Sequence, residues 1–272
     1  MPEHDVPSLF ERPGIAAVSA VAESPRSLAV AARTEQSVAI LTVHGVLDVS
    51  NSAALRDSIM KAKLDEPPSA VIIDVTALQV PTESAWSAFI SAHWQLDTRP
   101  DVPIVLVCSH RAGRDAIARS EVARFMPVYA TANSAMKAIE RLARRTVERA
   151  ETRLPANLTS LRESRRLVRE WLTAWSQTAL IPVALVVVNV FLENVLEHTG
   201  SDPVVRIECD GATATIAVSD GSTSPALRLP SPTKGVDVSG LAIVAALSGA
   251  WGSTPTSSGK TVWAVIGPEN QL

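Results

Sequence analysis

The sequence predicts two domains, an α/β domain followed by an α+β domain. A length of 272 residues suits two domains better than one. In the first half, short apolar segments alternate with helical patterns, which favours a sandwich of helices on a sheet. In the second half, the order is helix, helix, hairpin, loop, helix and strand. We therefore expect a mobile tail at 1–26, domains at 27–143 and 161–267, and a linker at 144–160.

The composition indicates a globular protein with ordinary cores. Hydrophobic residues make up 46% of the chain and charged residues 19%, and the net charge of -3 offers no electrostatic basis for binding nucleic acid. Cys108 and Cys209 lie in separate apolar segments, which favours buried free thiols over a disulfide and suits a reducing cytosol. The start of the chain lacks the features of a signal peptide, and the apolar run 179–188 is short for a membrane span. We expect a cytoplasmic protein without a membrane partner.

Four strand patterns alternate with four helix patterns in the first domain. The continuous apolar segment 70–75 is typical of a strand that is covered on both faces of its sheet. The expected strands lie at 37–48, 70–75, 103–108 and 128–130. The expected helices lie at 53–63, 83–96, 111–119 and 134–144.

Three stretches of this domain resemble a STAS domain, the fold of anti-sigma factor antagonists. Residues 45–48 (Gly-Val-Leu-Asp) are similar to the family's Gly-x-(Leu/Ile)-Asp turn. Residues 71–75 are similar to its central strand, and residues 132–138 to the start of its last helix. The resemblance covers about 27–143 and implies binding to an anti-sigma factor or to a kinase.

The phosphorylated turn of that family falls on residues 82–86. The family has Asp-Ser-Ser/Thr-Gly-Leu there, and this chain places Glu83 at the phosphoacceptor position. One interpretation is that Glu83 only completes a helix N-terminus, where negative charge is favoured. Another is that its carboxylate is a fixed, partial mimic of a phosphate. Ser84 is an alternative, displaced acceptor.

The second domain is predicted around one apolar helix that contains Pro182. Val187, Val190, Phe191 and Val195 share a face of this helix, and Gly200 follows as a left-handed cap. The remaining pattern comprises an amphipathic helix at 161–175, strands at 204–209 and 212–218 joined by an Asp-Gly turn, a loop at 226–237, a helix at 241–247 and a strand at 261–266.

This order and its motifs resemble the histidine-kinase-like ATPase domain, in the branch of the anti-sigma-factor serine kinases. The resemblance implies ATP and magnesium as cofactors, with Asn194 as the magnesium ligand and Asp220 as the acceptor for the adenine amino group. It further implies nucleotide contacts for His198, Gly240, Leu241, Lys260 and Thr261. Ordinary explanations compete: a surface amide at Asn194, a cation at a helix C-terminus at His198, and a solvated lysine at Lys260.

Two departures from the family pattern weaken an enzymatic role. The family's general base is a Glu four residues before Asn194, and this chain has Val190 there. Glu193 directly precedes Asn194 in the sequence, but successive residues of a helix point about 100° apart, so Glu193 is not an obvious replacement for the base. The family's Gly-Arg-Gly-Leu lid begins here with Val238 and Ser239, which removes a glycine and a cation from the phosphate site.

These resemblances imply a bacterial regulatory fusion in sigma-factor control that acts through protein contact and has a degenerate ATP site. The partner would be a sigma factor or a separate anti-sigma or antagonist protein, and the two domains would dock on each other within the chain or in a homodimer. Two alternatives stay open: an active ATP-dependent anti-sigma serine kinase, and a sensor that binds ATP without turnover.

Overall fold

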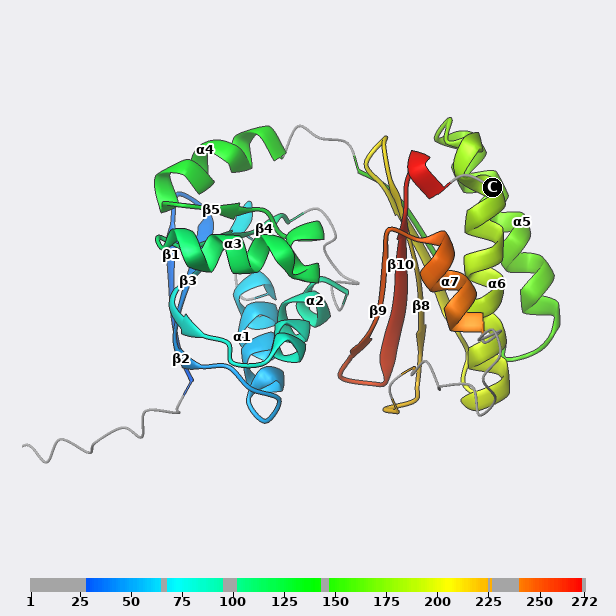
Figure 1. Ribbon diagram of the computed structural model, residues 1–272, viewed down its shortest axis with the longest axis horizontal. Coiled ribbons are helices and arrows are strands. Elements are labelled where there is room, and N and C mark those ends of the chain that lie inside the picture. The colour runs from blue at the N-terminus through cyan, green and yellow to red at the C-terminus, as the bar shows by residue number, and fades with distance from the viewer. Residues whose placement is uncertain are drawn as a thin grey trace, which may run out of the picture.

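The computed structural model describes residues 28–64, 68–94, 102–142, 147–224, 226 and 240–270. In these residues the chain forms two five-stranded sheets and seven α-helices, arranged as two domains side by side (Figure 1). The predicted tail 1–26 lies outside the described residues. So do Val238 and Ser239 and nearly all of the predicted loop 226–237.

The first domain is a mixed sheet with the strand order β1-β2-β3-β4-β5. Strands β2 to β5 are parallel, and β1 pairs with β2 in the antiparallel direction. Its strands are β1 (Ala29–Glu35), β2 (Val38–Val46), β3 (Ala70–Gln79), β4 (Ile104–Val107) and β5 (Val128–Tyr129). Its helices are α1 (Ser52–Leu64), the 3-10 turn η1 (Glu83–Trp86), α2 (Ser87–Trp94), α3 (Arg111–Arg119), the 3-10 turn η2 (Glu121–Arg124) and α4 (Ala132–Leu142).

Strand β3 is covered on both faces, as its continuous apolar sequence predicts. Val71 and Ile73 belong to a core that they share with side chains of α1, α2 and α3. Ala70 and Ile72 belong to a second core on the other face, which α4 covers. Successive side chains of a strand point to opposite faces, so a strand buried on both sides needs an uninterrupted apolar run.

The second domain is an antiparallel sheet with the order β6-β7-β8-β10-β9. Helices α5, α6 and α7 cover one face of it (Figure 1). Its strands are β6 (Glu148–Arg153), β7 (Val204–Cys209), β8 (Ala214–Asp220), β9 (Ala250–Pro255) and β10 (Lys260–Ile266). Its helices are α5 (Thr159–Ala174), η3 (Thr178–Leu180), α6 (Ile181–His198), α7 (Gly240–Leu247) and η4 (Pro268–Asn270).

Helix α6 forms the centre of the second core. Val187, Val190, Phe191 and Val195 are all buried, which confirms the predicted apolar face. Gly200 has φ +61°, so the predicted left-handed cap is present. The segment Thr178–His198 is long and apolar enough to cross a membrane by length and composition, which exceeds the expectation from the sequence. Half of its most apolar window is buried within the protein, and the central helix of a packed domain passes the same test.

Three strands differ from the expectations. Part of the expected linker, Glu148–Arg153, is strand β6, which pairs with β7. Its sequence is rich in charge because an edge strand with an exposed side needs no apolar run, and charge there protects the open edge. Strands β1 and β9 were not predicted either. Both are edge strands, and β9 contains Gly252 and Pro255, which are unfavourable in strand interiors.

Both predicted free thiols and the predicted hairpin turn are confirmed. Cys108 and Cys209 are buried and unpaired. Burial raises the pKa of the Cys209 thiol above its ordinary value, although a backbone hydrogen bond from Gly211 opposes this shift. Gly211 has φ +88°, and Asp210 Oδ1 accepts hydrogen bonds from the amides of Ala212 and Thr213 at 3.0 and 2.8 Å.

Candidate functional site

The candidate nucleotide site lies where α6, α7 and the ends of β8 and β10 meet. Asn194 is half-buried on α6, and His198 is exposed one turn further on, 3.9 Å from the carboxylate of Glu197. Glu193 is exposed and its Oε1 accepts a hydrogen bond from Asn189 Nδ2 at 2.7 Å. Val190 is only 7% exposed. Glu193 therefore does not take over the position of Val190, as its place on the helix predicts.

The first residue of α7 packs directly on Val190. A Cβ atom at Gly240 would lie 2.8 Å from Val190 Cγ1, so any side chain at this position would force Val190 to shift. Leu241 is 6% exposed and belongs to the core of the second domain. In this structure Leu241 is a core residue, and Gly240 packs closely on the side chain at the position of the family's general base.

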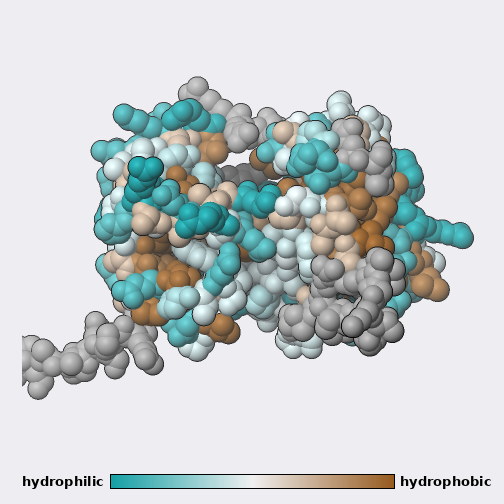
Figure 2. Space-filling view, in the orientation of Figure 1, coloured by the Kyte–Doolittle hydropathy of each residue, from teal (hydrophilic) through white to brown (hydrophobic). Residues whose placement is uncertain are grey.

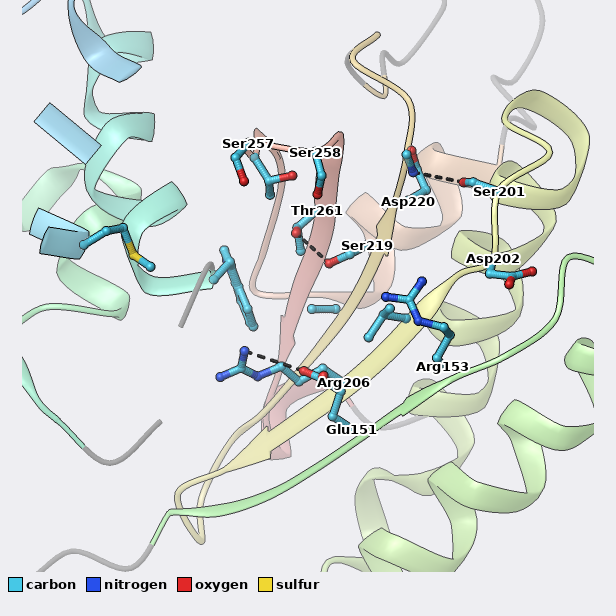
Figure 3. A pocket seen from close by; sticks show the side chains of 16 residues that line it. Glu151, Arg153, Ser201, Asp202, Arg206, Ser219, Asp220, Ser257, Ser258 and Thr261 are labelled. Atoms are coloured by element: carbon cyan, nitrogen blue, oxygen red, sulfur yellow. Dashed lines mark hydrogen bonds and ion pairs between the residues drawn. The ribbon is translucent and has the colours of Figure 1, made fainter. Parts of the chain in front are cut away.

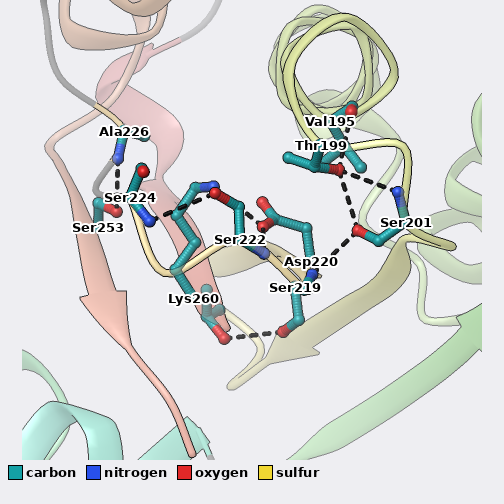
Figure 4. Close-up of polar contacts among 12 residues, drawn as sticks. Val195, Thr199, Ser201, Ser219, Asp220, Ser222, Ser224, Ala226, Ser253 and Lys260 are labelled. Carbon is teal, nitrogen blue, oxygen red and sulfur yellow. Dashed lines mark hydrogen bonds and ion pairs between the residues drawn. The ribbon is translucent and has the colours of Figure 1, made fainter. Parts of the chain in front are cut away.

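Asp220 is paired with a lysine from the neighbouring strand. Lys260 Nζ lies 2.9 Å from Asp220 Oδ1, and the two side chains are 9% and 1% exposed (Figure 4). The same oxygen accepts a hydrogen bond from the Ser222 amide at 2.7 Å. Gly259 is required beside them, since a Cβ there would lie 1.9 Å from the Asp220 carbonyl oxygen. One oxygen of the carboxylate that was expected to receive an adenine amino group is therefore already engaged within the protein.

Thr261 does not share a face with Asp220. Strands β8 and β10 are antiparallel, with Lys260 opposite Asp220 and Thr261 opposite Ser219. Directly opposed residues of an antiparallel pair point to the same side of the sheet, and the next pair points to the other side. Consistently, Thr261 Oγ1 lies 2.7 Å from Ser219 Oγ. Asp220 and Thr261, which were both expected at the adenine end of a nucleotide, therefore point to opposite faces of the sheet, and Lys260 is the residue opposite Asp220.

The binding of ATP at this site stays a prediction. A buried ammonium group pairs with one oxygen of the expected adenine acceptor, and Gly240 packs closely on Val190. Of the residues expected to contact the nucleotide, Asn194 is half-buried and His198 is exposed. We derive no chemical step through a nucleotide at this site.

The turn at Glu83 is on the surface of the first domain. Thr82, Glu83 and Ser84 are all exposed, and Glu83 begins η1 directly before helix α2. The charge of Glu83 also affects Glu121. Burial raises the pKa of Glu121 above its ordinary value, the negative charge of Glu83 adds to this rise, and Arg124 opposes it. The expected acceptor position is thus accessible and belongs to a small acidic surface.

The first domain covers the face of the second sheet that the helices leave open (Figure 1). Trp263 of β10 is fully buried in the core of the first domain, with its ring centroid 4.9 Å from that of Phe125. Ser91 Oγ of α2 donates a hydrogen bond to the Pro255 carbonyl at 2.7 Å, and Arg124 donates one to the Gly249 carbonyl at 2.9 Å. The docking of the two domains is therefore both apolar and hydrogen-bonded, and Figure 2 shows the domains meeting along the middle of the molecule.

A buried charge cluster crosses the same contact. Glu208 of β7 lies 3.4 Å from His93 Nε2 of α2, and it pairs with Arg149 and Arg206 at 2.9 and 2.7 Å. The Arg206 guanidinium also lies 5.5 Å from the ring centroid of Trp94. Burial strongly opposes ionisation of Glu208, but the nearby His93 imidazole and the charges of the two arginines outweigh it and hold the pKa of Glu208 well below its ordinary value.

Sequence reasoning missed Trp263 and Arg206 as contact residues, although one signal was present. Strand β10 is apolar at consecutive positions, Val262 through Ile266, so both of its faces need cover. Helices α6 and α7 cover one face, and the first domain covers the other. Arg206 has no comparable signal, because its sequence neighbours do not show that it lies under another domain.

Comparisons with known proteins identify the first domain. Residues 29–135 match the family model of the STAS domain. An anti-sigma factor antagonist from Mycobacterium paratuberculosis is 21% identical, covers 43% of this chain and 97% of its own, and has a TM-score of 0.37. The unphosphorylated anti-sigma factor antagonist SpoIIAA is 15% identical over 42% of this chain and 97% of its own, with a TM-score of 0.34.

A third similar structure contains the RsbU and RsbW domains of a Mycobacterium tuberculosis protein. It is 21% identical over 44% of this chain and 31% of its own, with a TM-score of 0.33. None of the curated proteins matches the sequence. The predicted resemblance of residues 27–143 to a STAS domain is confirmed over 29–135, and the predicted resemblance of 161–267 to a kinase-like ATPase stays a prediction. Residues 29–135 of this chain form a STAS domain.

Proposed function

We propose that this protein regulates a bacterial sigma factor through protein–protein contact, with an anti-sigma factor or an antagonist as the direct partner. The STAS domain supports this role, since STAS-containing antagonists are the proteins to which the chain is similar. The observation that carries the proposal is the exposure of Thr82, Glu83 and Ser84. Helix α2, which follows this turn, is held against the second sheet through Ser91, so the turn is presented on a fixed support.

The second domain acts in this proposal as a binding module without phosphotransfer. The Lys260–Asp220 pair supports this part of the proposal, because it engages one oxygen of the carboxylate that the adenine amino group would need. Val190 supports it too, because valine cannot act as a general base. Glu83 supports it as well. A carboxylate at the acceptor position cannot receive a phosphate as a serine hydroxyl does, whereas it carries a permanent negative charge. The regulatory state of this turn would then be constant rather than switched by a kinase.

The test is a binding measurement with the sigma factors, anti-sigma factors and antagonists of the source bacterium. Each is titrated against the full chain, against Glu83→Lys and against the control Glu140→Lys, which reverses an exposed charge on α4. We expect one of these proteins to bind the full chain, and we expect Glu83→Lys to weaken the affinity more than about tenfold, equivalent to about 1.4 kcal/mol. Glu140→Lys is expected to bind normally. Equal affinities for both variants, or binding by none of the candidates, would contradict the proposal.

A further inference from the structure

A polar cavity lies between the two domains, on the face of the second sheet opposite its helices (Figure 3). Its volume is about 520 Å³, which is within the usual range for sites that bind small molecules. Met60 of α1 and Trp94 of α2 form the wall from the first domain. The second domain forms the rest with strands β6, β7, β8 and β10, the loop between α6 and β7, the residue after β8 and the loop between β9 and β10, so the cavity exists only where the domains meet.

Six hydroxyl side chains line this cavity. They come from three segments of the second domain that the fold brings together: Ser201, Ser219, Thr256, Ser257, Ser258 and Thr261. Ser219 and Thr261 are hydrogen-bonded to each other, and the Ser201 hydroxyl accepts a hydrogen bond from the Gly221 amide. Each hydroxyl can donate once and accept twice, so these groups retain capacity for a ligand. A ligand that carries several hydroxyl groups would match this lining.

Two arginines add positive charge to the same wall. No hydrogen bond or ion pair of Arg153 is found among the described residues, and its side chain is exposed to the cavity. Arg206 is 5% exposed, and its Nε has no hydrogen-bond acceptor in the part of the chain that the structure describes. The network around Arg206 is thus one acceptor short. A ligand oxygen would supply this acceptor.

The acidic residues of the wall do not cancel this charge at Arg153. Glu151 Oε2 lies 3.8 Å from Arg206, and the Asp202 carboxylate accepts a hydrogen bond from the Ala156 amide at 2.9 Å. Asp220 is engaged by Lys260 on the other face of the sheet. Among the charged groups of the cavity, Arg153 is therefore the cation that remains available to a ligand.

We propose that this interdomain cavity binds a small hydroxylated anion, such as a sugar phosphate or a sugar acid. Arg153 receives the phosphate or carboxylate, and the serine and threonine hydroxyls receive the ligand's hydroxyl groups. Because both domains form the walls, a bound ligand contacts both and strengthens their docking. The ligand would thereby make the arrangement of the STAS domain dependent on a metabolite, a role that does not require the nucleotide site.

The test is calorimetric titration of the full chain with ribose 5-phosphate, with gluconate and with uncharged ribose. We expect saturable binding of at least one of the two anions, at least about tenfold tighter than that of ribose. Whichever anion binds identifies whether Arg153 selects a phosphate or a carboxylate. Failure of both anions to bind below about 10 mM, or binding of ribose as tight as theirs, would overturn the proposal.

Three variants locate the binding site. Arg153→Gln removes the available cation, and Met60→Trp fills the cavity from the first domain without removing a polar group. Each variant is expected to weaken the affinity for the anion at least about tenfold. Arg169→Gln makes the same change as Arg153→Gln on the exposed surface of α5 and is expected to bind normally. Unchanged affinity in Arg153→Gln or Met60→Trp would put the ligand outside this cavity and contradict the assignment.

Discussion

The Lys260–Asp220 pair gives the sharpest stability prediction, because it is buried and joins two central strands. Lys260→Met keeps most of the side-chain volume but removes the ammonium group 2.9 Å from Asp220 Oδ1. Loss of one partner of a buried ion pair costs about 3–5 kcal/mol. The Ser222 amide still donates to Asp220, so we expect the lower end, about 3 kcal/mol. For a domain of 150–250 residues, this corresponds to a Tm decrease of about 6–12 °C.

The measurement is urea unfolding of the full chain, of Lys260→Met, of Asp220→Ala and of the double variant. The losses of unfolding free energy in the two single variants should not add up to the loss in the double variant, and the coupling free energy of this double-mutant cycle should be about 2 kcal/mol or more. Lys137→Met, an exposed change on α4, is the control and should stay within about 0.5 kcal/mol of the natural sequence. A cost below about 0.5 kcal/mol for Lys260→Met, or a coupling near zero, would show that the pair is solvated and would refute this argument.

Three further predictions concern the domain contact and the helix contact. Trp263→Ala should cost about 3–5 kcal/mol and separate the domains in limited proteolysis, since the side chain is fully buried; intact docking in this variant would contradict the contact. Gly240→Ala should cost about 1–3 kcal/mol because of the 2.8 Å approach, and adding Val190→Ala should recover most of it; no recovery would refute the cause. Because the pKa of Glu208 is lowered from 4.5 in the folded protein, the stability that its ionised form contributes is complete above about pH 4.5 and is lost as the pH falls below that value. Glu208→Gln should remove this part of the pH dependence of the unfolding free energy. An unchanged loss of stability in acid would contradict the prediction.

Much of the fold follows from apolar periodicity. Helix α6 was predicted with its buried face and its glycine cap, and strand β3 was predicted as a strand covered on both sides. Edge strands β1, β6 and β9 were not predicted, because an exposed edge places little demand on residue type. The positions where periodic apolar burial is strong are therefore the positions that the sequence predicts well.

The candidate site was predicted less well, for a specific geometric reason. A motif gives the order of residues but not the strand register, and the register decides which neighbour shares a face. Asp220 and Thr261 were both expected to contact a nucleotide, yet the pairing of β8 with β10 puts Lys260 opposite Asp220 and places Thr261 on the other face. The charge of Lys260 could be read from the sequence, but its burial against Asp220 depends on that register. The cavity between the domains likewise depends on a docking geometry that no single segment encodes.

The central claim is that this protein works through contact and does not transfer phosphate. The most direct measurement is incubation of the full chain with radiolabelled ATP and magnesium, alone and with a separate STAS protein that retains its serine. The account predicts no label on either protein, because Val190 is at the general-base position, Lys260 occupies the space facing Asp220, and Glu83 replaces the acceptor. Transfer to either protein at about 1–100 per second, the usual range for kinases, and its loss in Asp220→Ala, would contradict the account.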